Sequence, residues 1–319
     1  MTAIPELVYS KQVEGKNDLP ARARTMRDAL QVSDQPLPSN VMQGLEKVQA
    51  SGSAQFGANN IAQLVDFLKK AQAKEIVVVD LRRESHCFIN GMPFTWYLSS
   101  SFNNMDKSFD EIEQDEHDRL KILSGLASSG KVKVLKLVKT AGAQKIDPTN
   151  VIEIPVQDLL LEKDMAKLHG LDYYRIPITD RLAPSKHAID RLLNLYMRDK
   201  SKWFHFHCNA GHGRTTTFLA LFDIMHNARE VALETILIRQ KLIGAGGAPL
   251  LRVSAKNGWQ AAAQTQRLQI LKEFHTYCAD NNDGYQTLFS VWLGKHKELA
   301  SELPILEDPT VDLTGFETE

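Results

Sequence analysis

The segment 203–225 restricts the fold more than any other part of the chain. It opens with the apolar run WFHF, continues as HFHCNAGHGRTTT over 205–217, and ends in the apolar run FLALFDIM. The first run is typical of a buried strand and the last of a buried helix. A buried strand that turns directly into a buried helix predicts a layered α/β arrangement.

Hydrophobic periodicity elsewhere supports the same fold class. The β-branched run EIVVVDL at 75–81 predicts a central buried strand, whereas residues 1–57 look mostly irregular. Further strands are predicted at 131–138, 151–156 and 172–178, and helices at 60–70, 106–129, 186–198, 214–226, 230–242 and 259–278. Because strands alternate with helices, we expect an α/β fold with a mainly parallel central sheet flanked by helices.

Composition limits the classes of partner. The formal net charge of the 319 residues is -1, which argues against nucleic-acid binding through bulk charge. Positive charge for an anionic substrate must therefore be concentrated locally. The three cysteines, Cys87, Cys208 and Cys278, have long spacings that fit neither a disulfide framework nor a zinc site.

Targeting signals are not visible in the sequence. The N-terminal residues lack a basic region followed by an apolar one, and no apolar run approaches the length of a membrane span. We therefore expect either a cytoplasmic location or export by a specialised secretion system. The sequence carries no signal for an oligomeric state.

The turn after the predicted strand at 203–206 has the features of an anion site. Backbone N–H groups converge at such a turn, the following helix adds its positive dipole end, and Gly211 and Gly213 permit close backbone approach. The same field would stabilise a thiolate at Cys208. Arg214, at the helix start, can grip two phosphoryl oxygens at once. This combination predicts phosphoryl transfer to sulfur.

Two further features bear on that chemistry. A hydroxyl at Thr215 or Thr216 could donate to the thiolate and help sulfur to leave from phosphocysteine. A buried structural cysteine beside a helix N-terminus is the alternative interpretation, and the residues around Cys208 argue against it.

Asp180 follows a predicted strand, in YYRIPITDRLAPS, and is the candidate general acid and base. Its alternative role is to cap a turn.

At this point the chain resembles the cysteine phytases, bacterial inositol polyphosphate phosphatases related to protein tyrosine phosphatases. The resemblance runs from about residue 19 to 300. Its motifs are HCNAGHGRTT at 207–216, SGSAQF at 51–56, VDLRRESHCFINGMPFTWY at 79–97, YYRIPITD at 173–180, IDRLLNLY at 189–196, RQKLIG at 239–244 and DGYQTLFSVWLGKH at 283–296.

The resemblance implies a phosphatase core, here 25–79 and 161–319, into which a small partial β-barrel of 10–24 and 80–160 is inserted. It implies stepwise removal of phosphates from inositol polyphosphates through a phosphocysteine intermediate. No metal or other cofactor is implied, and the expected partner is a small inositol phosphate. We expect no nucleic-acid partner and no membrane span.

The resemblance also assigns residues. Cys208 becomes the nucleophile, Arg214 the phosphate clamp and Asp180 the general acid, with support from Asp80, His207 and Thr215. The implied phosphate-binding residues are Asn209, Ala210, Gly211, His212, Gly213, Arg24, Arg181, Arg267 and Lys145.

Four positions depart from the family pattern. Asn209 stands where the family usually has Glu, His212 where it has a small apolar residue, Arg181 where it often has His, and Gln260 where it has Lys. The first three changes make the pocket more positive and the fourth removes a charge. We expect phosphate binding to persist, with an altered positional preference on the inositol ring.

Two other functions fit parts of the pattern. A protein tyrosine, dual-specificity or phosphoinositide lipid phosphatase would use identical chemistry, although lipid enzymes typically place lysines inside the loop. A binding module without turnover would lack the cysteine, the arginine or the aspartate, and all of these are present.

Overall fold

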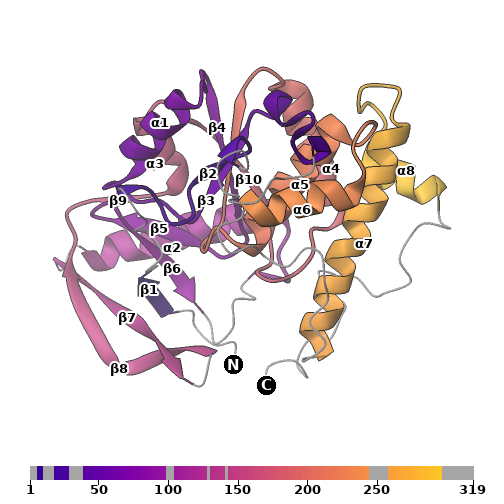
Figure 1. Ribbon diagram of the computed structural model, residues 1–319. Coiled ribbons are helices and arrows are strands. Elements are labelled where there is room, and N and C mark those ends of the chain that lie inside the picture. Colours follow the sequence, from indigo (N-terminus) through magenta and orange to yellow (C-terminus); the bar gives the residue numbers. More distant parts are fainter. Residues whose placement is uncertain are drawn as a thin grey trace.

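The computed structural model describes residues 6–9, 18–28, 39–97, 104–127, 130–140, 143–243 and 258–296. Within these ranges the strands form two sheets (Figure 1). The helices are α1 (Ile61–Lys70), α2 (Phe109–Ala127), α3 (Glu162–Leu168), α4 (Lys186–Arg198), α5 (Gly213–Asn227), α6 (Leu233–Ile243), α7 (Gly258–Asp280) and α8 (Phe289–Lys295), with 3-10 turns η4 (Ser39–Met42) and η5 (Leu45–Lys47). Helices α1, α3, α4 and α5 pack against the larger sheet, and α6, α7 and α8 pack against α4 and α5.

The larger sheet has the strand order β10-β4-β11-β3-β2. Its strands are β2 (Arg24–Thr25), β3 (Ala50–Ser53), β4 (Ile76–Arg82), β10 (Asp172–Ile178) and β11 (Trp203–His207). Neighbouring strands run parallel except for β2, which is antiparallel to β3. The predicted α/β class with a mainly parallel central sheet is confirmed.

Strand β4 shows why the VVV run lies at the centre. Val77 and Val79 pack with α4 and α5 on one face, whereas Val78 packs with α1, α3 and Trp203 on the other. A strand covered on both faces needs apolar side chains at consecutive positions. Fully burying one such side chain stabilises the fold by about 1.5–3 kcal/mol.

The smaller sheet has the order β8-β7-β1-β6-β5-β9. Its strands are β1 (Glu6–Tyr9), β5 (His86–Ile89), β6 (Met92–Tyr97), β7 (Lys131–Thr140), β8 (Ala143–Pro155) and β9 (Leu159–Leu160). The alternation in β7 buries Val132 and Val134 and exposes Lys131 and Lys133, as predicted. The hairpin of β7 and β8 projects on the side opposite α7 and α8 (Figure 1).

The smaller sheet is built from the chain region where the insert is expected, with a difference at its N-terminal part. The N-terminal strand of this sheet is Glu6–Tyr9, before the expected 10–24, and Arg24 pairs with the larger sheet. Residues 10–17 and 297–319 lie outside the described residues. The division into a core and a barrel insert stays a prediction.

The expectation of mostly irregular backbone up to residue 57 missed β3. This strand, ASGS, is fully buried between β11 and β2. Its small residues leave room for α5, because a Cβ at Gly52 would lie 2.5 Å from Cγ2 of Thr215. Tertiary packing therefore makes a strand from residues with weak strand propensity.

The topology gathers three loops at one edge of the larger sheet. The parallel strands β4, β10 and β11 end there, and ligands commonly bind at this edge of such sheets. None of the helices in the described ranges combines the length and apolar content needed to cross a lipid bilayer.

Candidate active site

The loop 208–213 joins β11 to α5 and is shaped by contact with β3. Gly211 has φ +66°, and a Cβ there would lie 2.3 Å from the backbone nitrogen of Ala54 and 2.5 Å from the carbonyl carbon of Ser53. Only glycine fits this backbone and this space. The backbone N–H of Gln55 also donates to the carbonyl of Asn209 at 3.2 Å. The loop is therefore fixed against the end of a neighbouring strand.

Cys208 is the first residue of this loop and is 2% exposed. The hydroxyl of Thr215 donates to its Sγ at 3.2 Å. Burial acts to raise the pKa of Cys208, but the charge of Arg214 and the Thr215 hydrogen bond outweigh it and lower that pKa below its ordinary value. The site thus favours a thiolate.

Arg214 lies in the first turn of α5 and forms a bidentate ion pair with Glu84. Its Nη1 donates to Oε2 of Glu84 at 2.7 Å and its Nη2 to Oε1 at 3.0 Å. Its Nε is buried and has no hydrogen-bond partner within the described part of the chain. This N–H is therefore available to an oxyanion beside Cys208.

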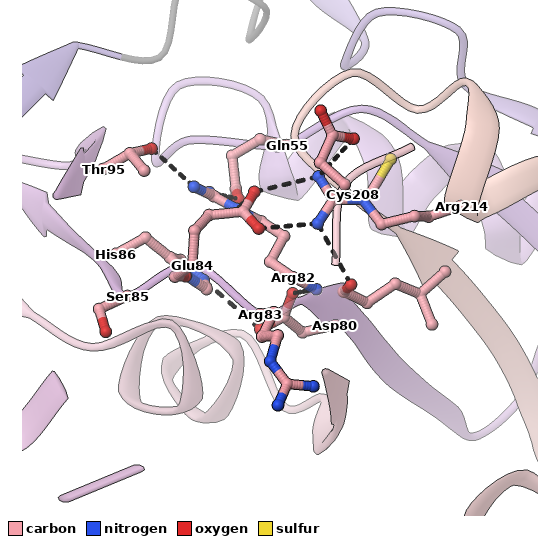
Figure 2. A network of polar contacts seen from close by, with 12 residues as sticks. Gln55, Asp80, Arg82, Arg83, Glu84, Ser85, His86, Thr95, Cys208 and Arg214 are labelled. Carbon is pink, nitrogen blue, oxygen red and sulfur yellow. Dashed lines mark hydrogen bonds and ion pairs between the residues drawn. The ribbon is translucent and has the colours of Figure 1, made fainter. Parts of the chain in front are cut away.

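Glu84 was missed by the sequence analysis. Its signal was present in DLRRESH, where an acidic residue follows a buried strand beside two arginines. Figure 2 shows Glu84 between Arg82 and Arg214. Burial would raise the pKa of Glu84, but the charges of Arg214 and Arg82 hold it far below its usual value.

Asp180 follows β10 and enters the same site. Its Oδ1 lies 3.2 Å from Nη2 of Arg214, and its side chain is 33% exposed. Arg181 has φ +67° and an exposed guanidinium. Arg267 of α7 supports this turn, because its Nη2 donates to the carbonyl of Arg181 at 2.6 Å. The structure therefore brings the candidate acid next to the candidate nucleophile and clamp.

Two arginines from the N-terminal part hold the loop from its other side. Nη1 of Arg22 donates to the carbonyl of Ala210 at 2.7 Å, and Nη1 of Arg24 to that of Gly211 at 3.0 Å. Burial lowers the pKa of Arg24 to about 10. Arg22 was missed, although LPARAR contains both arginines. Arg24 lies under the loop and ties it to β2.

His212 lies where the positive charges of three arginines act on the loop. Burial lowers its pKa, and the charges of Arg22, Arg24 and Arg267 lower it further. Its Nδ1 has no hydrogen-bond partner within the described part of the chain. The local positive charge that the near-neutral chain requires for an anionic ligand is therefore found here.

A second group of charged side chains lies behind the loop. Nε2 of His207 lies 2.5 Å from Oε1 of Glu162, and Nε2 of His86 lies 3.0 Å from its Oε2. Burial lowers the pKa of His207, but Glu162 outweighs that effect and raises it. Glu162, in turn, has a pKa well below the usual value, because His207 and His86 outweigh its burial.

Asp80 belongs to this buried group. Its Oδ1 accepts from the backbone N–H of Arg82 at 2.8 Å, and its Oδ2 accepts from the Tyr173 hydroxyl at 3.0 Å. Potential ligand atoms of Asp80, Glu162 and His207 lie within 4.8 Å of one another. Because Asp80 is hydrogen-bonded and Glu162 is paired with His207, we interpret the group as a charge network that supports the loop.

Two residues singled out in the sequence lie elsewhere. Lys145 lies on β8 opposite Val138, and its side chain is outside the described residues. Cys87 is unbridged and packs among apolar side chains of the smaller sheet, whereas Cys208 belongs to the core of the larger one. Burial raises the pKa of Cys87. We find no basis for a disulfide between them.

A family model and several solved structures are similar to this chain in sequence and fold. The family model of the protein-tyrosine-phosphatase-like phytases, described as "Inositol hexakisphosphate", matches residues 79–226. The tandemly repeated phytase of Mitsuokella multacida is 30% identical with a TM-score of 0.77, over 92% of this chain and 50% of that one. A structure of the Mitsuokella protein with myo-inositol-(1,3,4,5)-tetrakisphosphate is 29% identical over the same shares, with a TM-score of 0.77.

Two other bacterial relatives extend the comparison. The Bdellovibrio bacteriovorus phytase structure is 27% identical, with a TM-score of 0.67, over 92% of this chain and 95% of that one. The effector protein hopD2 of Pseudomonas syringae pv. tomato is 24% identical over 256 residues, 79% of this chain. The chain spans about half the length of this curated relative, 53%. Sequence, fold and loop agree in one resemblance: residues 79–226 match the family model of the protein-tyrosine-phosphatase-like phytases, and the fold is similar to their solved structures.

Proposed function

We propose that the protein is a phosphatase that removes phosphates stepwise from inositol polyphosphates through a phosphocysteine intermediate. The observation that carries this proposal is the meeting of three groups at one loop. Cys208 has a lowered pKa, Arg214 has a buried and unpartnered Nε within the described residues, and Asp180 lies 3.2 Å from Arg214. Nucleophile, clamp and acid are thereby in reach of one phosphoryl group.

In the first step the thiolate of Cys208 attacks phosphorus, and the bond from phosphorus to the inositol oxygen breaks. The acid form of Asp180 transfers its proton to that oxygen, so the leaving group departs as an alcohol. Loop N–H groups and Nε of Arg214 bind the equatorial oxygens, where negative charge is spread in the transition state.

In the second step water attacks the phosphorus of phosphocysteine. The carboxylate of Asp180 takes a proton from this water, and the phosphorus–sulfur bond breaks. The hydroxyl of Thr215, 3.2 Å from Sγ, stabilises the thiolate as it leaves. Orthophosphate is released and the starting protonation states return.

The rim supports a highly phosphorylated substrate. Exposed Arg22 donates to the loop, exposed Arg181 follows Asp180, and the buried Arg24 and Arg267 add positive charge, whereas the chain as a whole carries a net charge of -1. A single phosphate needs only the loop and Arg214, so the additional cations suit further phosphates on the same molecule. A relative of known structure holds an inositol tetrakisphosphate.

The test is phosphate release from inositol hexakisphosphate in EDTA, beside a phosphotyrosine peptide, for the wild type and Cys208→Ser. We expect metal-independent release from the inositol substrate, with a higher kcat/KM than for the peptide and none in the variant. Retained turnover in Cys208→Ser would overturn the mechanism. A higher kcat/KM for the peptide would leave the nucleophile in place and overturn the substrate in favour of a protein phosphatase.

We also propose that the protein acts after export by a specialised secretion system. The support is the relative named as an effector protein. A translocation reporter fused to the C-terminus should reach host cells from a secretion-competent strain and not from a secretion-deficient one. Equal signals from both strains would contradict export by that route and favour the cytoplasmic alternative.

A further inference from the structure

Arg82 lies behind the phosphate-binding arginine and is completely buried. We propose that Arg82 is a positioning residue, which orients Arg214 through Glu84 and makes turnover depend on a contact with the smaller sheet. The proposal rests on the phosphatase function above and concerns how that function is maintained.

Every nitrogen of the Arg82 guanidinium has its own acceptor. Nε donates to Oε1 of Glu84 at 3.0 Å, Nη1 to Oε1 of Gln55 at 2.5 Å, and Nη2 to Oγ1 of Thr95 at 2.6 Å (Figure 2). Three acceptors from three segments of the chain fix both the plane and the rotation of the guanidinium.

Glu84 transmits this orientation. Its Oε1 accepts from both Arg82 and Arg214, and its Oε2 accepts from Arg214. Rotation of the carboxylate would therefore break a bond to one guanidinium or the other. Because both terminal nitrogens of Arg214 are hydrogen-bonded to this carboxylate, the orientation of the carboxylate also sets the direction of the Arg214 Nε–H.

The link from Arg82 through Glu84 to Arg214 lowers the free energy of the transition state more than that of the bound substrate. Charge on the transferring oxygens is stabilised by donors already aimed at them, so a small rotation of Arg214 costs more there than in the bound substrate. We therefore expect kcat to fall when the link is weakened, with little change in KM.

Thr95 is the remote end of the link. It lies on β6 of the smaller sheet, is 6% exposed and, within the described residues, is linked to Arg214 through Arg82 and Glu84. Thr95→Val keeps the shape of the side chain and removes its hydroxyl, so it weakens the link without touching the loop. Thr95→Ser restores the hydroxyl.

Ser85 supplies the matched control. It belongs to the same segment as Glu84, and its hydroxyl donates to Oδ2 of Asp115 at 2.7 Å, outside the link. Ser85→Ala likewise removes a hydroxyl that is bonded to a charged side chain, and the part-buried bonds that it loses are those to Asp115 and from Asn104. It should leave kcat unchanged if only the Arg82 link matters.

The experiment measures kcat and KM on inositol hexakisphosphate, thermal melting, and affinities for orthovanadate and inorganic phosphate. Vanadate resembles the transition state and phosphate the product. For Thr95→Val we expect about a fivefold loss in kcat and in vanadate affinity, the size of one hydrogen bond. KM and phosphate affinity should stay within about twofold. Arg82→Lys should lose more, about tenfold or beyond, if it folds.

The outcomes separate cleanly. Recovery in Thr95→Ser with wild-type values in Ser85→Ala supports the positioning role. A folded Thr95→Val with wild-type kcat and vanadate affinity overturns it, as does an equal loss in Ser85→Ala. If the wild type itself neither hydrolyses phosphomonoesters nor binds vanadate, the phosphatase function fails, and the role of Arg82 fails with it.

Discussion

The face of the catalytic loop and the network behind it differ in charge balance. At the face, the positive charges of Arg22, Arg24 and Arg267 act on His212, and the carboxylates that act on these arginines include Asp180 and Asp28. Behind it, opposite charges pair directly, as in Arg82 with Glu84, Arg175 with Asp80 and His207 with Glu162. Paired buried charges hold the side chains in one arrangement. An excess of positive charge, by contrast, attracts an anionic ligand.

The largest effect should come from removing the nucleophile at the face. Cys208→Ser should lower kcat by at least about 10³-fold, because a serine hydroxyl lacks the reactivity of a thiolate at this loop. Inorganic phosphate should still bind, since the arginines remain. Calorimetric titration with phosphate checks binding, and loss of both binding and turnover would mean that the loop has collapsed.

Asp180→Asn should lower kcat by about 10²- to 10⁴-fold, because the leaving oxygen loses its proton donor. KM should change little, which steady-state kinetics would show. The matched control is Asp172→Asn at the other end of β10, where the carboxylate pairs with Lys202 at 2.7 Å. If Asp180→Asn kept turnover within about threefold, another group would have to be the acid.

Phosphate should stabilise the protein, because it neutralises the unbalanced face. At a hundred times its Kd a ligand adds about 2.7 kcal/mol, which raises Tm by several degrees in a chain of this size. Arg22→Ala should weaken phosphate affinity by about threefold, as expected for a partly exposed charge. Arg119→Ala, which breaks an ion pair on α2, should not alter the phosphate-induced shift.

The thiolate can be tested by alkylation across pH. The pKa of Cys208 is lowered, so the rate at which Cys208 is alkylated should rise with pH through a midpoint below the free-thiol value of about 8.5. Thr215→Val should move this midpoint upward, since a donor to the thiolate is lost. Mass spectrometry can assign the site, with buried Cys87 and Cys278, whose pKa values are raised by burial, as internal references.

The smallest expected effect tests the network behind the loop. Because the pKa of His207 is raised on folding, its contribution to stability is complete below the unfolded value of about 6.5 and is lost as pH rises through the folded value. Denaturant melts at increasing pH, starting from about 6.5, should show this loss, and His207→Gln should flatten that slope. A wild-type slope unchanged by the substitution would place the titration elsewhere.

The parts that sequence predicts well are those with local causes. The strand, turn and helix around Cys208 follow from consecutive apolar runs and from glycines at fixed spacing, and the structure has them at 203–227. Asp180 could be named because it follows a strand in the same way. Each of these inferences needs only neighbouring residues.

The parts that sequence misses depend on distant segments. Glu84 holds Arg214 from 130 positions away, and its charged neighbours give no indication of which arginine it will meet. In strand β3, Gly52 has no space for a larger residue because Thr215 of α5 packs against it. Arg24 reads as a ligand contact, yet its partners include the carbonyl of Gly211 and the hydroxyl of Thr216.

Gly211 packs directly against β3, which lies outside the segment matched by the family model. The segment that can be recognised in the sequence is therefore shorter than the segment that the loop needs in order to fold. The segment 79–226 contains Cys208, Arg214 and Asp180 and is the part matched by the family model. Expressed alone, it would leave the loop without Ser53, Ala54 and Gln55, which supply its contact surface and a backbone donor. Such a fragment would carry the catalytic residues and Glu84, but it would lack the strand against which the loop is fixed.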